Sequence, residues 1–172
     1  SDAILSIEID PRSCDVSKLE LLRELGFSRV SFGVQDFDEK VQQAIHRQQS
    51  YQLVETLVVA ARTLGFSSVN LDLVYGLPWQ QAASFATTLQ QVIELNPDRV
   101  SLFSYAHLPE RFAAQRKIPN DGLPNAQQKL ELLALSVKTL GQAGYQAIGM
   151  DHFAKAHDSL AVAQREGKLA RK

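Results

Sequence analysis

Three polar side chains stand in or next to short strand-like segments, where they could converge on a ligand. Glu8 lies in ILSIEI, Gln35 follows RVSFGV, and Asp72 lies in SVNLDLV. Carboxylates accept hydrogen bonds and an amide both donates and accepts, so these groups could bind ribose hydroxyls or a ligand ammonium. Polar groups on buried strands are costly unless they are used, although backbone groups or basic side chains at a barrel rim could also satisfy them.

Arginine and lysine side chains offer a second kind of chemistry, because a guanidinium can bind a carboxylate through two parallel hydrogen bonds. Arg47 follows a predicted helix and could hold a ligand carboxylate, although a lone arginine more often lies on the surface. Arg111, Arg116 and Lys117 lie in a polar stretch over 107–124, where they could receive an acidic substrate or simply be solvated.

Cysteine and histidine spacing argues against a metal site built by this chain alone. Cys14 is the only cysteine, so these residues form no internal disulfide and no multi-cysteine metal site. The four histidines have no metal-ligand spacing, and no glycine-rich phosphate loop or serine nucleophile motif is present. Asp151 and His152 follow a predicted strand and could face a substrate, but no residue is identified as catalytic.

The elements that must position these residues alternate between β-branched runs and amphipathic ones. Strands are predicted at 4–9, 29–34, 68–74, 99–105 and 146–150, and helices at 16–25, 51–64, 82–95 and 126–140. Asp36 with Glu39 predicts a capping box at the start of a further short helix. A glycine followed by an aromatic residue separates helix from strand three times, which indicates repeated βα units and a parallel sheet.

Alternation along three strands favours a (β/α) barrel over an ordinary doubly wound α/β domain. One set of faces is polar or small: Ser6, Glu8, Asp10, Ser31, Gly33, Gln35, Asn70 and Asp72. The opposite faces are apolar: Ile7, Ile9, Val30, Phe32, Val34, Leu71 and Leu73. Parallel strands covered by helices on both sides are usually apolar on both faces, so this pattern suits a lumen that holds a polar ligand. The polar residues lie toward the carboxyl ends of their strands, where α/β folds place their sites.

Composition excludes several classes of protein. The 172 residues are 45% hydrophobic and 22% charged, as in a globular domain. Lysine and arginine total 18 against 19 acidic residues, so a charge of −1 gives no electrostatic reason to propose nucleic acid or an anionic membrane as partner. No apolar run approaches the roughly 20 residues of a membrane helix and no signal peptide is present, so a cytoplasmic protein is expected.

The chain closely resembles the oxygen-independent coproporphyrinogen III oxidases, which are radical S-adenosylmethionine (SAM) enzymes of heme biosynthesis. The motifs that carry the resemblance cover nearly the whole chain: SIEIDPR, FGVQDF, HRQ, NLDLVYGLP, YAHLPERFAAQRKI, IGMDHFA and AVAQREGKL. It implies an α/β fold, a partial TIM-like (β/α) radical SAM barrel over 1–154, followed by a polar tail over 155–172. It also implies SAM contacts at Glu8, Gln35, Arg47, Asp72 and Ala106, with two SAM molecules in neighbouring sites.

The reaction implied by this resemblance is the oxidative decarboxylation of two propionates of coproporphyrinogen III to vinyl groups, giving protoporphyrinogen IX in anaerobic heme biosynthesis. A [4Fe-4S] cluster, supplied with electrons by a donor, cleaves SAM to a 5′-deoxyadenosyl radical, which abstracts hydrogen from a propionate carbon. A substrate with four carboxylates gives Arg111, Arg116 and Lys117 a plausible partner. The protected lumen fits this chemistry, because such a radical must meet only its substrate.

The chain departs from the family at the cluster. Family members hold it with closely spaced cysteines that precede the segments matched here, and Cys14 stands in the wrong context. We therefore expect a central fragment of the enzyme, inactive by itself. One alternative is a radical-SAM-like heme chaperone without oxidase activity, although YAHLP, AQRKI and GMDHFA favour the oxidase. A second alternative is an unrelated α/β barrel with a sugar or phosphate ligand.

Overall fold

The computed structural model describes residues 4–118, 122–149, 151–158, 161–162 and 165, and its strands and helices alternate through most of that length. The strands are β1 (Leu5–Ile9), β2 (Phe27–Gln35), β3 (Ser68–Tyr75), β4 (Arg99–Ser104), β5 (Tyr145–Ile148) and β6 (His152–Lys155). The helices are α1 (Val16–Glu24), α2 (Glu39–Ala44), α3 (Tyr51–Thr63), α4 (Ala82–Leu95) and α5 (Ala126–Gln142), with short 3-10 turns η1 (Pro11–Ser13) and η2 (Ala113–Lys117).

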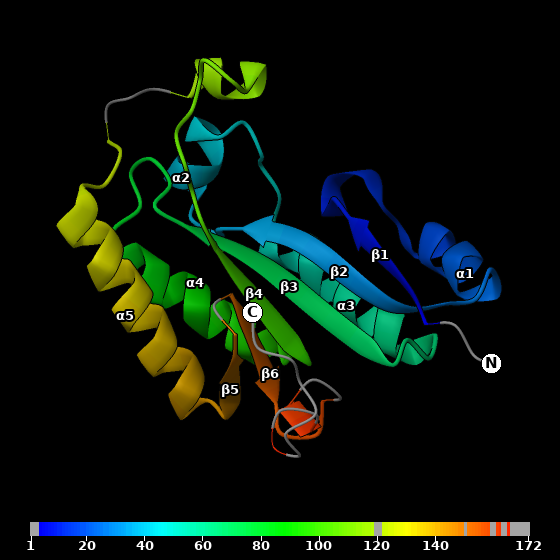
Figure 1. Ribbon diagram of the computed structural model, residues 1–172. Helices are drawn as coiled ribbons and strands as arrows, with labels where there is room; N and C mark the ends of the chain where they lie inside the picture. The colour runs from blue at the N-terminus through cyan, green and yellow to red at the C-terminus, as the bar shows by residue number, and fades with distance from the viewer. Residues whose placement is uncertain (1–3, 119–121, 150, 159–160, 163–164, 166–172) are drawn as a thin grey trace.

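The described strands form one sheet in the order β1-β2-β3-β4-β6-β5. Strands β1 to β4 run parallel, as the repeated βα pattern predicts, and their carboxyl ends point to the top of Figure 1, toward α2 and η2. Strand β6 is not among the predicted strands, and it lies between β4 and β5, antiparallel to both. Phe153 and Ala154 are buried there and hold the strand in place. The residues around them are polar, so the sequence pattern does not indicate a strand.

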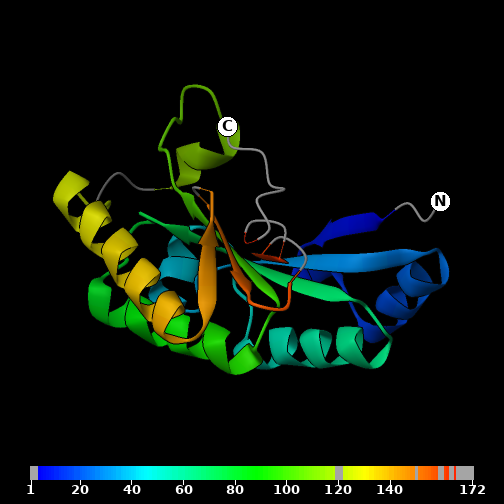
Figure 2. The same cartoon turned by 60° about the horizontal axis from the view of Figure 1, so that its bottom comes forward.

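The apolar face of the sheet packs against helices. Figure 2 shows α3 and α4 side by side along this face, while none of the described helices covers the other face. The predicted apolar set is buried here except for Ile7, which is partly buried, and Phe32, Leu71 and Leu73 are wholly inaccessible to solvent in the same core cluster as Phe85 and Leu89 of α4. Burying one such side chain stabilises the folded state by roughly 1.5–3 kcal/mol. The alternation of apolar residues therefore determines which face of the sheet packs against helices and which face stays open.

Side-chain caps mark the first turns of α1, α2 and α3. Asp15 accepts a hydrogen bond from Lys18 N at 2.8 Å, and Ser50 caps α3 in the same way. The predicted capping box at Asp36 is wrong, because Asp38 caps α2 and accepts from Val41 N. Asp36 is instead fully buried. No helix among the described residues is long and apolar enough to cross a membrane.

The β5–β6 hairpin is anchored to the parallel sheet by a buried hydroxyl. Tyr145 is 4% exposed and its hydroxyl donates to Pro97 O at 2.6 Å, just before β4 begins. Tyr145→Phe removes this donor and leaves a buried carbonyl without a partner, so we expect a loss of about 1–3 kcal/mol in the free energy of unfolding, measured by urea denaturation. Tyr51→Phe is the control, since that ring packs against Phe37 and has no hydroxyl bond in the described structure, and an equal loss in both variants would contradict the prediction.

Candidate ligand-binding cavity

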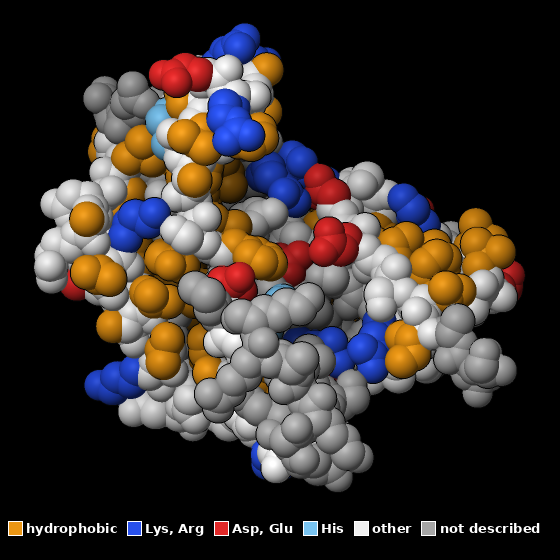
Figure 3. Space-filling view, viewed as in Figure 1, with side chains coloured by type: hydrophobic (Ala, Val, Ile, Leu, Met, Phe, Trp, Pro, Cys, Tyr) orange, Lys and Arg blue, Asp and Glu red, His pale blue; other side chains and the backbone are white. Residues whose placement is uncertain are grey.

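The open face of the sheet is hollowed by a cavity of about 250 Å³. Acidic and basic side chains gather around this hollow in Figure 3. Polar residues from five strands line it, and they are Ser6, Glu8, Arg29, Ser31, Ser68, Asn70, Asp72, Arg99, Ser101 and His152. The predicted polar lumen is therefore present, and it contains two of the three strand residues singled out from the sequence, Glu8 and Asp72.

Asp72 is the acceptor on which the cavity's hydrogen bonds converge. Asn70 Nδ2 donates to Asp72 Oδ1 at 2.7 Å and also to Ser31 Oγ at 2.7 Å, and Ser31 Oγ donates to Asp72 Oδ2 at 3.1 Å. Ser101 Oγ continues the chain, because it donates to Asn70 Oδ1 at 3.2 Å and lies 3.2 Å from His152 Nδ1. The neighbouring strands thus fix the orientation of the Asp72 carboxylate before any ligand arrives.

Burial shifts the ionisation of this carboxylate. Desolvation raises the pKa of Asp72 above its ordinary value, and the negative charge of Glu8 adds to the rise. Hydrogen bonds from Ser31 and Asn70 favour the charged form and act in the opposite direction. Asp72 is therefore a carboxylate whose charge is sensitive to the groups that enter the cavity.

Gln35 and Arg47 meet over Gly33, next to the cavity. Gly33 pairs with Asp72 across β2 and β3. A Cβ atom at position 33 would lie 3.2 Å from Arg47 Nη2 and 3.3 Å from Gln35 Nε2, so only glycine leaves both side chains this room. Arg47 Nη2 donates to Gly33 O at 3.1 Å and lies 3.5 Å from Asp10 Oδ1.

Arg47 is held in place but retains an unused donor. Its Nε is buried and has no hydrogen-bond partner in the described structure. Desolvation lowers the pKa of Arg47, whereas the charge of Asp10 raises it. Buried polar atoms nearly always have a partner, and Gln49 Oε1 is the other buried side-chain atom that lacks one among the described residues.

Gln35 reaches this position through an irregularity that strand alternation does not predict. The register between β2 and β3 shifts between Gly33 and Gln35, and Gln35 has a φ of 67°. A bulge of this kind redirects a side chain at a strand end, and here it places the amide beside Arg47.

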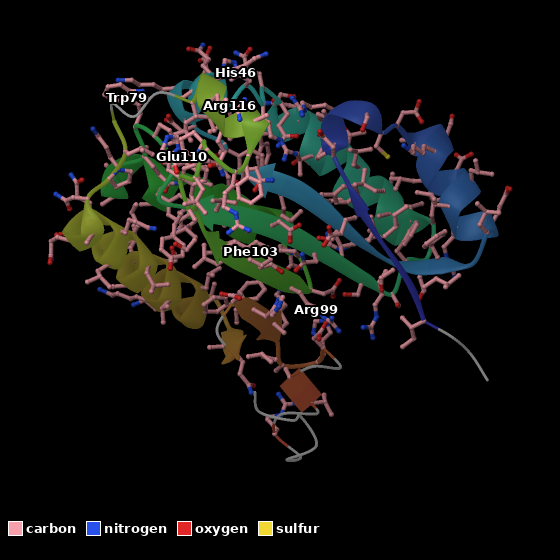
Figure 4. All side chains as sticks on the ribbon, turned by 45° about the horizontal axis from the view of Figure 1, so that its top comes forward. His46, Trp79, Arg99, Phe103, Glu110 and Arg116 are labelled. Carbon is pink, nitrogen blue, oxygen red and sulfur yellow. The ribbon has the colours of Figure 1, made fainter. Side chains whose placement is uncertain are left out.

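The loop after β4 lies at the carboxyl end of the strands, beside the segment that carries Arg47. Ala106 is exposed and its carbonyl accepts from Gln115 Nε2 at 3.0 Å, while Lys117 O lies 3.3 Å from His46 Nε2. In Figure 4, His46 and Arg116 lie together at this end, whereas Phe103 and Arg99 lie farther along the sheet.

The three basic residues predicted to receive substrate are exposed and do not line the cavity. The Arg111 guanidinium lies 5.8 Å from the Phe112 ring centroid, and Arg116 Nε donates to Pro109 O at 3.1 Å. The described contact of Lys117 is made by its backbone carbonyl and not by its ammonium group. The geometry places all three in a loop next to the candidate site rather than within it.

Several other residues in and near the cavity were not predicted from the sequence. Ser101 and Phe103 line the cavity from β4 at alternate positions, a signal that was present in RVSLFSY. Arg29 and Arg99 lie toward the amino ends of their strands, away from the positions where sites are expected. Asp10 and Arg12 form an ion pair of 2.7 Å at the end of β1, which the spacing of the two residues alone does not identify.

The described residues offer no set of ligands for a metal cluster. Cys14 is buried, and desolvation raises the pKa of its thiol, which disfavours the thiolate that binds iron. No group of three or more histidine, cysteine, aspartate or glutamate residues in the described ranges could hold a metal ion. An iron–sulfur cluster therefore does not fit the residues of this chain.

Comparison with known proteins places the fold and the cavity in a family. Residues 1–92 match the Radical SAM superfamily, and this match covers more than half of the chain. The chain belongs to the radical SAM superfamily, and its predicted partial (β/α) barrel fold is confirmed.

Within that superfamily, the chain is similar to the oxygen-independent coproporphyrinogen III oxidases, as its motifs predict. It is 56% identical over 99% of its length to the enzyme of Salmonella typhimurium, and 58% identical over 96% to that of Pseudomonas aeruginosa. The structure of coproporphyrinogen III oxidase from Escherichia coli, a radical SAM enzyme, matches with a TM-score of 0.95 and 55% identity, covering 99% of this chain and 39% of that one. The chain spans 37% and 36% of the length of the two relatives.

The environment of Asp72 predicts how its ionisation responds to mutation. Ser31→Ala removes a donor that stabilises the charged form, so the pKa of Asp72 should rise further, as measured by carbon-13 NMR titration. Because the folded pKa already exceeds the unfolded value, this group's contribution to stability is present below the unfolded pKa and is lost as pH rises through the folded pKa. Ser28→Ala, on the same strand but outside the cavity lining, is the control. An unchanged Asp72 titration in Ser31→Ala would contradict the prediction.

Proposed function

We propose that this chain forms the SAM-holding part of an oxygen-independent coproporphyrinogen III oxidase, with SAM contacts at Glu8, Gln35, Arg47, Asp72 and Ala106. The observation that carries the proposal is the meeting of the Arg47 guanidinium and the Gln35 amide over Gly33, which pairs with Asp72 of the polar cavity. High identity to named oxidases supports the choice of reaction.

The residues in and beside the cavity fit the chemical groups of SAM. Arg47 is suited to the methionyl carboxylate, because its guanidinium already lies in a fixed orientation and its side chain is 26% exposed. The carboxylates of Glu8 and Asp72 are suited to the ammonium or to ribose hydroxyls, and the Gln35 amide can serve either a donor or an acceptor. Ala106 offers only backbone or close apolar contact. A second SAM in a neighbouring site is proposed from the family resemblance alone.

When bound, SAM and a reduced [4Fe-4S] cluster supply the radical chemistry that removes hydrogen from a substrate propionate. The part proposed for this chain is to bind and orient SAM, and to exclude water from it with the apolar-backed sheet. Since Cys14 does not provide a cluster site, we propose that residues outside these 172 hold the cluster and that an electron donor reduces it. By itself, the chain is expected to be inactive.

The substrate proposed for the whole protein is coproporphyrinogen III, whose two reacting propionates are oxidatively decarboxylated, each losing its carboxyl group as CO₂, to the vinyl groups of protoporphyrinogen IX. Arg111, Arg116 and Lys117 would contribute positive charge near the carboxyl end of the strands, where they could attract the carboxylates of this substrate. The relatives described above carry the oxidase name, so the heme chaperone alternative has no support among them. A cytoplasmic location stays a prediction.

The reaction is tested with the intact protein, loaded with its cluster and kept under anaerobic conditions with SAM, a reductant and coproporphyrinogen III. Formation of protoporphyrinogen IX is the expected result. Cleavage of SAM without this product would contradict the oxidase function and would favour a heme-binding role.

SAM binding predicts a specific loss on removal of the guanidinium. Arg47→Ala should weaken SAM affinity about 10- to 100-fold, since a charged hydrogen bond is worth roughly 1.5–3 kcal/mol, and isothermal titration calorimetry on the intact protein measures it. Gln48→Ala alters an exposed neighbour and should leave the affinity unchanged. Equal SAM affinity in Arg47→Ala and the native protein would refute this binding role.

A further inference from the structure

A hydrogen-bonded group of buried polar side chains lies at the carboxyl end of β2, outside the cavity lining. Nine polar or charged residues are buried in the described part of the chain, and five of them belong to this group. We call it the Asp36 network, and its members are Asp36, Gln42, Gln49, Gln80 and Thr88. Neither the predicted site nor the proposed function uses these residues, so their concentration at one place requires a reason.

Asp36 is a fully buried carboxylate satisfied by neutral donors. Thr88 Oγ1 and Asp38 N donate to its Oδ1, the latter at 2.9 Å, and Gln80 Nε2 donates to its Oδ2 at 2.8 Å. Burial raises the pKa of Asp36, while these donors act in the opposite direction. The bonds tie the end of β2 to α4 and to the segment after β3, because a buried carboxylate must keep its partners or incur a large desolvation cost.

Gln42 and Gln49 tie the same strand end to the segment that carries Arg47. Gln42 Nε2 donates to Asp36 O at 2.8 Å, and Gln42 Oε1 accepts from Gln49 N at 3.2 Å. Gln49 Nε2 then donates to Gly33 O at 3.1 Å and to Val34 O at 3.0 Å. Arg47 Nη2 donates to the same Gly33 carbonyl, so Gln49 and the guanidinium are fixed against one acceptor.

The backbone beside this network adopts conformations that L-residues avoid. Four described non-glycine residues have positive φ, and three of them lie here: Gln35 at 67°, His46 at 57° and Trp79 at 66°. Gln35 directly precedes Asp36, Trp79 directly precedes Gln80, and His46 directly precedes Arg47. Such conformations persist only where surrounding contacts over-determine them, and they cluster at functional sites.

We propose that the Asp36 network is a positioning set, which holds the Gln35 amide and the Arg47 guanidinium together over Gly33 in the geometry that binds SAM. Its members touch no ligand and act through these two residues. This inference rests on the proposed function, because it presumes that Arg47 contacts SAM. Gln49 is the most direct member, since its amide bonds the carbonyl that also anchors Arg47.

A double-mutant cycle on the intact protein tests the inference by SAM affinity, measured by calorimetry well below the melting temperature of each variant. Gln49→Ala should weaken SAM binding about five- to tenfold in the native background. In the Arg47→Ala background the same change should weaken it about twofold or less, because its main route of action is gone. Gln48→Ala, the exposed neighbour, should have no effect in either background.

A second variant tests the network at its centre. Asp36→Asn keeps the shape but turns one oxygen into a donor, which faces the Gln80 amide. Gln80 cannot rotate to adapt, since its Oε1 accepts from Gly76 N at 2.6 Å and from Leu77 N at 3.3 Å. SAM affinity should fall at least as far as in Gln49→Ala. Should Asp36→Asn fail to fold, the Gln49 cycle decides the matter.

The outcomes separate this inference from the function on which it rests. If Arg47→Ala weakens SAM binding but Gln49→Ala does not, the positioning role is wrong and SAM binding stands. If Gln49→Ala has an equal effect in both backgrounds, the network serves general stability and the positioning role is again wrong. If Arg47→Ala leaves the affinity unchanged, the proposed SAM contact fails and the inference fails with it.

Discussion

The two-residue period of the parallel strands is the constraint on which both the core and the cavity depend. Phe32 and Leu71 are buried against helices, while Ser31 and Asp72 point to the open face. A slip of one residue in any strand would exchange these faces, burying polar groups without partners and exposing the core. The cavity chemistry is therefore not added to a finished fold, because the apolar packing that stabilises the sheet also selects the residues that face a ligand.

This dependence explains why so much of the fold could be predicted from the sequence. Alternation and helix caps are local patterns, so the strands, the polar lumen and the places of Glu8 and Asp72 followed from short windows of sequence. The parallel order followed from repeated helix, glycine and strand. Ala106 was proposed from the family motifs alone, whereas Arg47 was also proposed from the chemistry of its guanidinium, and periodicity identifies neither.

The parts that sequence reasoning missed depend on contacts between distant residues. Asp36 precedes Glu39 at the spacing of a capping box, but Thr88 and Gln80, 52 and 44 positions away, supply the partners that make burial possible. The bulge at Gln35 also depends on contacts between distant residues, because the Asp36 network surrounds Gln35 and holds its unfavourable φ. Strand alternation therefore does not predict it. Strand β6 was missed because only Phe153 and Ala154 of its four residues are buried, and pairing with β4 defines it.

The contacts of Arg47 orient its guanidinium without fully neutralising its charge. Asp10 forms close charged hydrogen bonds with Arg12, one of them at 2.7 Å, and this pairing lowers the pKa of the Asp10 carboxyl. The same carboxylate lies 3.5 Å from Arg47, a weaker pairing that leaves Nε without an acceptor. Gly33 O and Asp10 thus orient the guanidinium, while Arg12 competes for the carboxylate. A ligand carboxylate would meet an arginine that is already oriented and incompletely neutralised, so less of its binding energy is lost in ordering the side chain.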